Sequence, residues 1–273
     1  MHQARWGNLT GYVSSLSRVE GGLSEQVTLI TGAAGHLGSA IATAMADRGS
    51  RLALADIDRT ALQRVADGLR SSRATVITHK VDVASEDDVR RLVDATVEGF
   101  GRIDVCINNC GVEGPVRFIE DLDIDEVVKQ YQVNVFGAVR LMKALIPHFK
   151  THRAGRIINI ASGAGLAGSE LMAAYSSSKH AVVGLSRSAA RELAPYNVPV
   201  NAVCPGVIAS PMMARIERAL EERTGRPASF EHAVPMGRYA EATEVANLVT
   251  YLALDAPLYL TGAAIVIDGA LRA

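Results

Sequence analysis

The chain has 273 residues, with 28 basic and 29 acidic side chains and a formal net charge of −1. This length allows one large α/β domain or two small ones, and a hydrophobic content of 48% argues against disorder. The near-neutral charge argues against nucleic acid as a partner, and the absence of an apolar run of about 18 residues argues against a membrane span. The three cysteines (Cys106, Cys110 and Cys204) have neither a disulfide-framework nor a zinc-finger spacing, which indicates a reducing compartment and no metal site.

The N-terminal segment differs in character from the rest of the chain. Residues 1–22 contain no continuous apolar stretch of the kind found in signal peptides, so we expect a cytoplasmic protein. We interpret residues 1–22 as an extension, which is either a flexible tail or an arm that contacts another subunit. No linker or internal repeat divides the remainder, and we therefore predict one domain over residues 23–273.

Short runs rich in Val and Ile alternate with longer helical patterns along this domain. The expected strands are residues 27–31, 51–56, 75–81, 103–108, 156–160, 199–203 and 264–267. Helical patterns at 40–48, 60–69, 87–100 and 125–149 lie between the first five of them. This alternation predicts a parallel sheet that is covered by helices on both faces. The polar, proline-containing segment 210–240, with a helical pattern at 213–222, is interpreted as a substrate lid, and a plain surface excursion is the alternative.

A glycine-rich turn follows the first expected strand and opens the first helix. Gly32, Gly35 and Gly38 are spaced by three residues, which lets the backbone approach a pyrophosphate at a helix N-terminus. Asp56 follows Gly38 by 18 residues, where an acid accepts hydrogen bonds from the adenosine ribose and repels a 2′-phosphate. We therefore predict a dinucleotide site that prefers NAD, with Arg59 as the one contrary residue.

A tyrosine and a lysine lie one helical turn apart near the middle of the chain. Tyr175 and Lys179 are at positions i and i+4, so they share one face of a helix. A free phenol loses its proton only near pH 10, and a neighbouring ammonium together with an oxidised nicotinamide would lower that pKa. The pair alone is a weak signal, because chance matches to this spacing are frequent.

Taken together, these motifs resemble the short-chain dehydrogenase/reductase family over residues 23–273. The resemblance also includes Asn108-Asn109-Cys110-Gly111, Pro205-Gly206 and the closing Ile267-Asp268-Gly269. The glycine loop departs from the usual family pattern at Gly35 and His36. Its glycine spacing is more like that of the extended branch of the family. The resemblance implies an α/β fold: a single doubly wound Rossmann domain with a mostly seven-stranded parallel sheet and helices on both faces.

The resemblance also implies residue roles. Tyr175 is the expected general acid/base, and Lys179 lowers its pKa and binds the nicotinamide ribose. Ser162 donates a hydrogen bond to the substrate oxygen, and Asn134 holds a water that links Lys179 to a proton relay. The implied cofactor contacts are Gly32, Gly35, His36, Leu37, Gly38, Asp56, Ile57, Asp82, Val83, Asn109, Gly111, Tyr175, Lys179, Pro205, Gly206, Ile208 and Ser210.

These roles predict an NAD-dependent oxidoreductase that interconverts a secondary alcohol and its ketone. The expected pocket walls are mostly apolar and favour a cyclic or medium-sized apolar substrate, although core packing would explain the same residues: Ala164, Leu166, Leu171, Met172, Val207, Met212, Met213 and Ile216. Glu113 and Glu170 are the only nearby charges. A 3-oxoacyl-carrier-protein reductase type and an inactive nucleotide-sensing protein are the alternatives. The resemblance implies a homotetramer.

Overall fold

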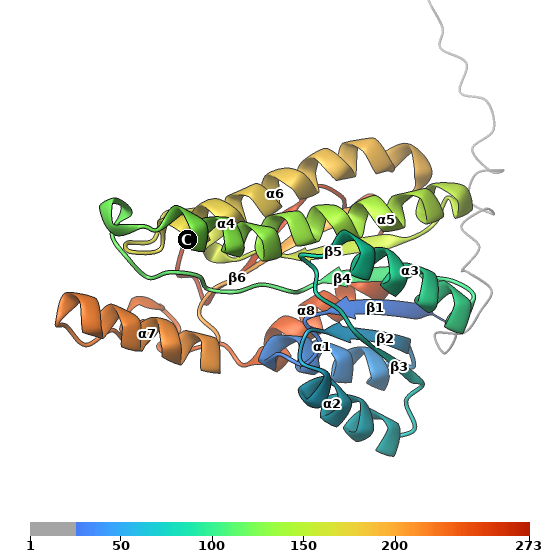
Figure 1. Ribbon diagram of the computed structural model, residues 1–273, viewed down its shortest axis with the longest axis horizontal. Helices are drawn as coiled ribbons and strands as arrows, with labels where there is room; N and C mark the ends of the chain where they lie inside the picture. The colour runs from blue at the N-terminus through green and yellow to red at the C-terminus, as the bar shows by residue number, and fades with distance from the viewer. Residues whose placement is uncertain (1–25) are drawn as a thin grey trace, which may run out of the picture.

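The computed structural model describes residues 26–273, so the predicted extension at residues 1–22 lies outside the described residues. The sheet contains the seven predicted strands (Figure 1). They are β1 (Val27–Thr31), β2 (Arg51–Asp56), β3 (Val76–Lys80), β4 (Val105–Asn108), β5 (Arg156–Ile160), β6 (Val200–Pro205) and β7 (Ala264–Ile267). Every neighbouring pair is parallel, in the order β3-β2-β1-β4-β5-β6-β7. This confirms the predicted fold class.

Helices cover both faces of the sheet. They are α1 (His36–Asp47), α2 (Arg59–Ser71), α3 (Glu86–Phe100), α4 (Ile124–Tyr131), α5 (Gly137–His152), α6 (Ala173–Leu193), α7 (Pro211–Thr224) and α8 (Ala242–Leu254). One core contains Leu92 of α3, Leu145 of α5 and Leu193 of α6. The other contains Ile41 of α1 and Val249 of α8. Figure 1 shows the two helical layers on opposite sides of the strands.

One predicted helix is interrupted. The helical pattern over residues 125–149 predicts a continuous helix, whereas the structure has α4 and α5 joined by a π-helical turn, Gln132–Phe136. The turn contains Asn134, whose side chain is bonded to the loop after β4. Single π turns are frequent at functional sites, and hydropathy patterns do not reveal them.

The strand order places the functional segments at one edge of the sheet. The chain moves outward from β1 to β2 and β3, then returns to β4 on the other side of β1. A crevice forms at the carboxyl ends of parallel strands where the order reverses in this way. The glycine loop after β1, Asp56 at the end of β2 and Ser162 after β5 therefore meet at that edge.

The segment predicted as a lid stands apart from the two helical layers. Figure 1 shows α7 extending away from the sheet. The ends of the segment are joined at its base, because Ala209 N–H donates to the Ala240 carbonyl at 3.0 Å and Ala240 N–H to the Val207 carbonyl at 2.9 Å. Of the helices within residues 26–273, none has both the length and the apolar character that crossing a membrane requires.

Candidate active site

The glycine loop brings the start of α1 tightly against the end of β1. Gly32 has φ +64°, and a Cβ atom at Gly38 would lie 2.0 Å from the Gly32 carbonyl oxygen. Only glycine fits at Gly38 without moving backbone. The N-cap of α1 is Gly35, so no side chain caps the helix, and its first turn contains no acid. The first-turn N–H groups, beginning at His36, are thus free to bind an anion such as pyrophosphate.

Asp56 is held in place by this loop. Its Oδ2 accepts a hydrogen bond from Ala34 N–H at 2.9 Å, and its Oδ1 accepts one from Asp58 N–H at 3.0 Å. Each carboxylate oxygen can accept a second hydrogen bond, so the acid retains capacity for two ribose hydroxyls. Ile57, the next residue, is exposed. The structure therefore places Asp56 where the sequence predicted it, beside the glycine turn.

Asn109 connects the end of β4 to the same loop. Its Nδ2 donates to the Thr31 carbonyl at 3.1 Å and to the Gly32 carbonyl at 3.0 Å. The amide thus donates to one carbonyl at the end of β1 and to another at the start of the glycine loop. Asn109, an implied cofactor contact, therefore ties the end of β4 to the glycine loop.

Asp82 and Val83 directly follow β3 at the same edge. Asp82 accepts a hydrogen bond from Ala84 N–H at 2.8 Å, and its own N–H donates to Asp88 at 3.1 Å. Val83 is buried against Gly137, where a Cβ atom would approach within 2.9 Å of the valine side chain. The pair is therefore rigidly placed beside the ribose end of the crevice.

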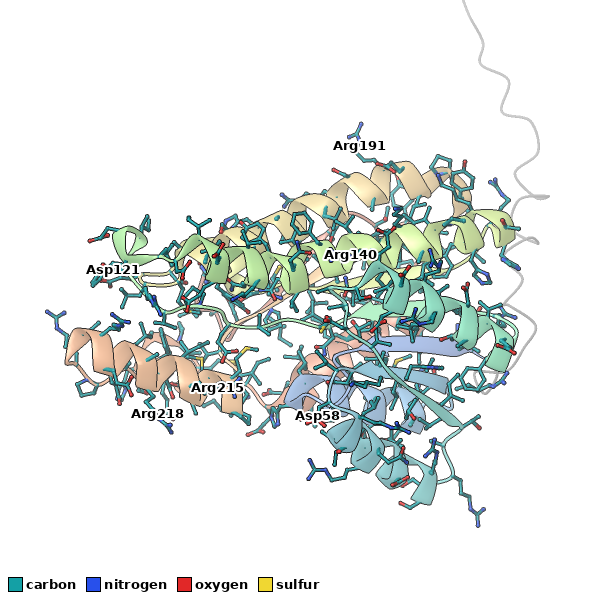
Figure 2. All side chains as sticks on the ribbon, viewed as in Figure 1. Asp58, Asp121, Arg140, Arg191, Arg215 and Arg218 are labelled. Carbon is teal, nitrogen blue, oxygen red and sulfur yellow. The ribbon has the colours of Figure 1, made fainter. Side chains whose placement is uncertain are left out.

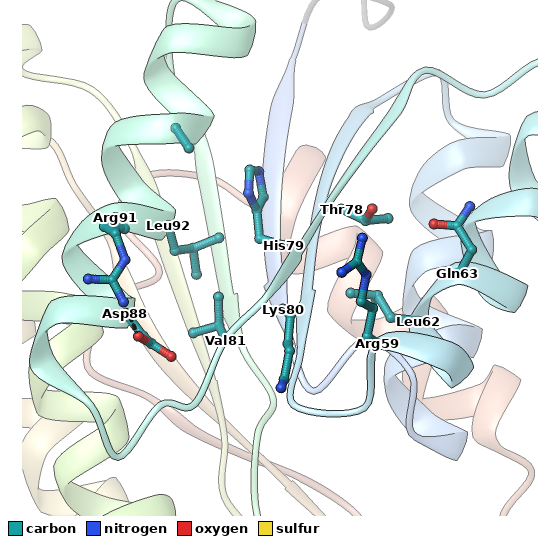
Figure 3. A pocket seen from close by; sticks show the side chains of 11 residues that line it. Arg59, Leu62, Gln63, Thr78, His79, Lys80, Val81, Asp88, Arg91 and Leu92 are labelled. Atoms are coloured by element: carbon teal, nitrogen blue, oxygen red, sulfur yellow. Dashed lines mark hydrogen bonds and ion pairs between the residues drawn. The ribbon is translucent and has the colours of Figure 1, made fainter.

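A cleft of about 380 Å³ opens at the edge of the sheet beside β3. Figure 3 shows Arg59 and Gln63 reaching it from α2 and Arg91 from α3. Arg91 is paired with Asp88, whereas Arg59 and Lys80 have no ion-pair partner among residues 26–273. Lys80 is also the register partner of Asp56. Two exposed cations thus lie near Asp56, and none of the four predicted catalytic residues lines this cleft.

The predicted catalytic pair lies at the start of α6. Lys179 is 4% exposed, and its ammonium donates to the Ile160 carbonyl at the end of β5, at 2.9 Å. Its Nζ is 5.7 Å from the centre of the Tyr175 ring. Burial lowers the pKa of Lys179 to about 8. A buried ammonium is costly, so its retention here points to a functional role.

Tyr175 and Ser162 face each other across the end of β5. Burial raises the pKa of Tyr175, a hydrogen bond with Ser162 lowers it, and the charge of Glu113 raises it. Ser162 also accepts a hydrogen bond from Ala164 N–H at 3.1 Å, which fixes its side chain. Among the protein's own groups burial therefore dominates the pKa of Tyr175, and its lowering by Lys179 stays a prediction for the enzyme with bound cofactor.

Asn134 contacts the backbone of the loop after β4. Its Oδ1 accepts from Val112 N–H at 2.8 Å, and its Nδ2 donates to the Val112 carbonyl at 2.9 Å and to Ser178 at 3.1 Å. A Cβ atom at Gly111 would lie 3.2 Å from the Lys179 ammonium. The side chain of Asn134 thus holds this loop beside Lys179 through hydrogen bonds to the Val112 backbone. The predicted water relay stays a prediction.

The segment after β6 joins the sheet to segment 210–240. Gly206 N–H donates to the Ile267 carbonyl at 2.8 Å, and a Cβ atom at Gly206 would be 2.7 Å from the Asp268 backbone. Ile208 forms an isolated bridge with Ala240. Ser210 caps α7 by accepting a hydrogen bond from Met213 N–H at 3.2 Å, which leaves its hydroxyl proton free to donate.

Sequence reasoning missed two residues that shape the substrate side. Gln130 is buried and donates to the Glu113 carbonyl at 2.9 Å, beside the left-handed Gly114. Arg215 of α7 forms an ion pair with Glu113. No sequence signal indicates this pair, because 102 residues separate its members. Of the expected pocket walls, Ala164, Leu171, Met172 and Ile216 are buried, and Leu166, Val207, Met212 and Met213 are half-buried.

Comparison with known proteins identifies relatives over nearly the whole described chain. The family model described as "Enoyl-(Acyl carrier protein) reductase" matches residues 32–271. A trans-4-hydroxycyclohexanecarboxylate dehydrogenase of Sinomonas cyclohexanicum is 36% identical, over 93% of this chain and 95% of that protein. An (S)-acetoin-forming diacetyl reductase of Staphylococcus epidermidis is 35% identical, over 90% and 98%. A 3-oxoacyl-[acyl-carrier-protein] reductase of Thermotoga maritima is 33% identical, over 91% and 98%.

Solved structures agree with the observed fold. The crystal structure of levodione reductase has a TM-score of 0.86 and 33% identity, covering 90% of this chain and 96% of that one. NAD+-bound xylitol dehydrogenase has a TM-score of 0.84 and 35% identity, over 90% and 98%. An actinorhodin polyketide ketoreductase variant with NADPH has a TM-score of 0.87 and 31% identity, over 91% and 98%. Fold, site geometry and sequence identity agree: the chain belongs to the short-chain dehydrogenase/reductase family of oxidoreductases.

Proposed function

We propose that this chain is an NAD-dependent dehydrogenase/reductase that interconverts a secondary alcohol and its ketone. The observation that carries the proposal is the convergence of Tyr175, Ser162 and Lys179 at the same sheet edge as the uncapped start of α1. A phenol beside a buried ammonium supplies proton transfer, and a free helix N-terminus supplies a pyrophosphate site.

The residues at the sheet edge fit a dinucleotide. The tight glycine loop and the free N–H groups of α1 would hold the pyrophosphate, together with Leu37 and Gly38. Asp56 would accept the ribose hydroxyls, and Asp82 and Val83 would border the adenine. Gly111, Pro205, Gly206, Ile208 and Ser210 would line the nicotinamide end. NAD, when bound, accepts or donates the hydride.

Asp56 supports NAD over NADP. Its carboxylate is fixed by two backbone N–H groups and would meet a 2′-phosphate with like charge. Arg59 and Lys80 act in the opposite sense, because both are exposed cations at the border of the ribose end. Of the similar structures, one holds NAD+ and another NADPH. The measured preference will therefore show which of these charges dominates.

The protein's own groups then carry the proton chemistry. Ser162 donates to the substrate oxygen and stabilises the charge that develops on it. Tyr175 takes the proton from the alcohol hydroxyl, or returns it to the carbonyl oxygen. Lys179 supplies a positive charge near the phenol and, with the cofactor bound, favours the phenolate. Asn134 keeps the loop after β4 in place beside Lys179.

The substrate proposed for this site is a cyclic or medium-sized alcohol with an apolar body. Half-buried methionines Met212 and Met213 at the start of α7 support it, since methionine adapts to irregular shapes. The hydroxycyclohexanecarboxylate dehydrogenase among the similar proteins supports a ring. Segment 210–240 is proposed as the lid, within one catalytic domain over residues 23–273.

Nicotinamide absorbance at mildly alkaline pH tests the proposal directly. NAD and NADP are compared in parallel against cyclic, aromatic and linear secondary alcohols, each with its ketone in the reverse direction. We expect turnover with a cyclic alcohol and a higher kcat/KM with NAD. A higher kcat/KM with NADP would contradict the assignment of Asp56, and binding of NAD without turnover of any alcohol would favour a nucleotide-sensing protein.

A second candidate is reduction of a 3-oxoacyl group on a carrier protein. The description of the matching family model and the Thermotoga maritima relative favour it. The near-neutral composition and Asp56 oppose it, because an enzyme of this type would favour NADPH and a basic docking patch. An acetoacetyl thioester assayed with both cofactors distinguishes the two. A kcat/KM above that of every alcohol or ketone would favour the second candidate.

A homotetramer in the cytoplasm completes the proposal. The α4–α5 face carries large exposed apolar side chains, namely Ile124, Val128, Phe136 and Val139. Such a stripe on adjacent helices is typical of a subunit contact. Light scattering coupled to size-exclusion chromatography is expected to give four times the chain mass, and a monomer would contradict this assembly.

A further inference from the structure

The loop after β4 crosses the substrate side of the catalytic residues. At its start, Gly111 lies against the Lys179 ammonium. At its end, Arg117 N–H donates to the Leu171 carbonyl at 2.8 Å, just before Tyr175 in the chain. Glu113 is near the middle of this loop, and its charge acts on Tyr175. Because Glu113 lies between these two contacts with the catalytic region, its carboxylate belongs to the loop that borders the space in which the substrate must lie.

This carboxylate is held firmly from two sides. Gln130 anchors the Glu113 carbonyl at 2.9 Å, and Arg215 of α7 binds the side chain, with Nε–Oε1 2.5 Å and Nη2–Oε2 3.3 Å. The Glu113 side chain is 19% exposed, whereas Arg215 is 57% exposed. Figure 2 shows Arg215 on α7, the helix of the lid segment. The outer side of Glu113 is thus covered by the lid.

We propose that Glu113 is a specificity-determining residue that accepts a hydrogen bond from a second hydroxyl group of the substrate, while Arg215 positions it. The inference rests on the proposed function and adds a polar requirement to an otherwise apolar pocket. The substrate class is then an alcohol with a second hydroxyl group near the reacting carbon, or the corresponding hydroxyketone.

The charges at the site select a neutral donor. A carboxylate has about four acceptor positions, and Arg215 occupies two of them. An anionic substituent would be repelled by Glu113, and a cationic one would meet the guanidinium of Arg215. A hydroxyl group donates to the carboxylate without either conflict. A site that hydrogen-bonds a substrate hydroxyl also discriminates strongly against the analogue that lacks it.

Paired substrates test the inference. The wild-type chain and Glu113→Gln are compared on cyclohexanol and on the vicinal cyclohexanediol, with NAD saturating. We expect the wild type to prefer the diol, and Glu113→Gln to reduce that kcat/KM ratio by about 10- to 100-fold, the size of a hydrogen bond to a charged group. Asp255→Asn is the matched control, because Asp255 also holds one arginine through two bonds, to Arg48 at 3.0 Å each.

Arg215→Gln provides a second variant that leaves Glu113 in place. We expect the diol:cyclohexanol ratio of kcat/KM to fall, because a freed carboxylate is still an acceptor but is less well placed. If the Glu113–Arg215 pair only clamps the loop to the lid, each variant should change kcat/KM by the same factor for both substrates. That result would overturn the inference while the proposed function stands. If neither alcohol is turned over, both the inference and the proposed function are overturned.

Discussion

Replacing Lys179 by methionine separates the catalytic use of this residue from its effect on stability. Lys179 is 4% exposed, and within residues 26–273 its ammonium has one hydrogen bond, to the Ile160 carbonyl. Burial disfavours the charged form, so the pKa falls from 10.5 to about 8 in the folded chain. In the unfolded chain the ammonium is solvated and keeps its ordinary pKa. Methionine has a similar length and carries no charge.

The sign and size of the stability effect follow from this difference in pKa. Between pH 8 and 10.5 the unfolded chain binds more protons than the folded chain, so the stability contributed by this site rises with pH. Below pH 8 the folded chain must carry the buried charge, at a cost of about 3 kcal/mol, since one pKa unit corresponds to about 1.36 kcal/mol. That cost disappears above pH 10.5.

Chemical denaturation of Lys179→Met and of the wild type across this pH range measures the effect. We expect the wild type to gain about 3 kcal/mol of unfolding free energy relative to the variant between pH 7 and 10.5. Lys143→Met is the control, because Lys143 is 70% exposed and paired with Glu86. The difference in unfolding free energy between the wild type and Lys143→Met should not increase in this way between pH 7 and 10.5. Parallel profiles for wild type and Lys179→Met would refute the reasoning about burial, whatever the effect on turnover.

Three further changes have defined outcomes. Asp56→Asn removes the charge that would face a 2′-phosphate. We expect the NAD:NADP ratio of kcat/KM to fall about tenfold, since one charge contact near the surface amounts to about 1–4 kcal/mol. Asp67→Asn on α2 is the control and should leave this ratio unchanged. Gly38→Ala places a Cβ 2.0 Å from the Gly32 carbonyl, so a fluorescence titration should show loss of NAD binding together with a lower Tm, and normal binding would contradict the tight loop. Because burial raises the pKa of Tyr175, alcohol oxidation should accelerate as pH rises above neutrality, and a rate that is flat from pH 6 to 10 would contradict a phenol with a raised pKa as the base.

The strands and their sheet could be predicted because their signal is local. Runs such as Val27–Thr31 and Arg156–Ile160 are short, apolar and rich in branched residues, as buried parallel strands require. The position of Asp56 could be predicted for the same reason, since it ends the second such run. Within residues 26–273 the strands and the parallel sheet therefore follow from pattern, whereas the doubly wound arrangement is implied by the family resemblance.

The remaining features depend on contacts between distant segments. The π turn at Asn134 exists where its amide meets the backbone of Val112, 22 residues earlier. The Glu113–Arg215 pair requires α7 to lie beside the loop after β4. The cations beside β3 come together only when α2 and β3 pack. Local propensity contains none of this information, because each contact is created by the fold.

The most direct test of the central claim is the turnover of Tyr175→Phe. The substitution removes only the phenolic oxygen, so the ring still packs at the start of α6, and the glycine loop and Asp56 are unchanged. We predict that NAD binds with an affinity within a few-fold of the wild type while alcohol oxidation falls by at least a hundredfold, which is the lower range for loss of a general acid/base. Turnover within tenfold of the wild type, with NAD bound normally, would contradict the assignment of Tyr175 and with it the proposed mechanism.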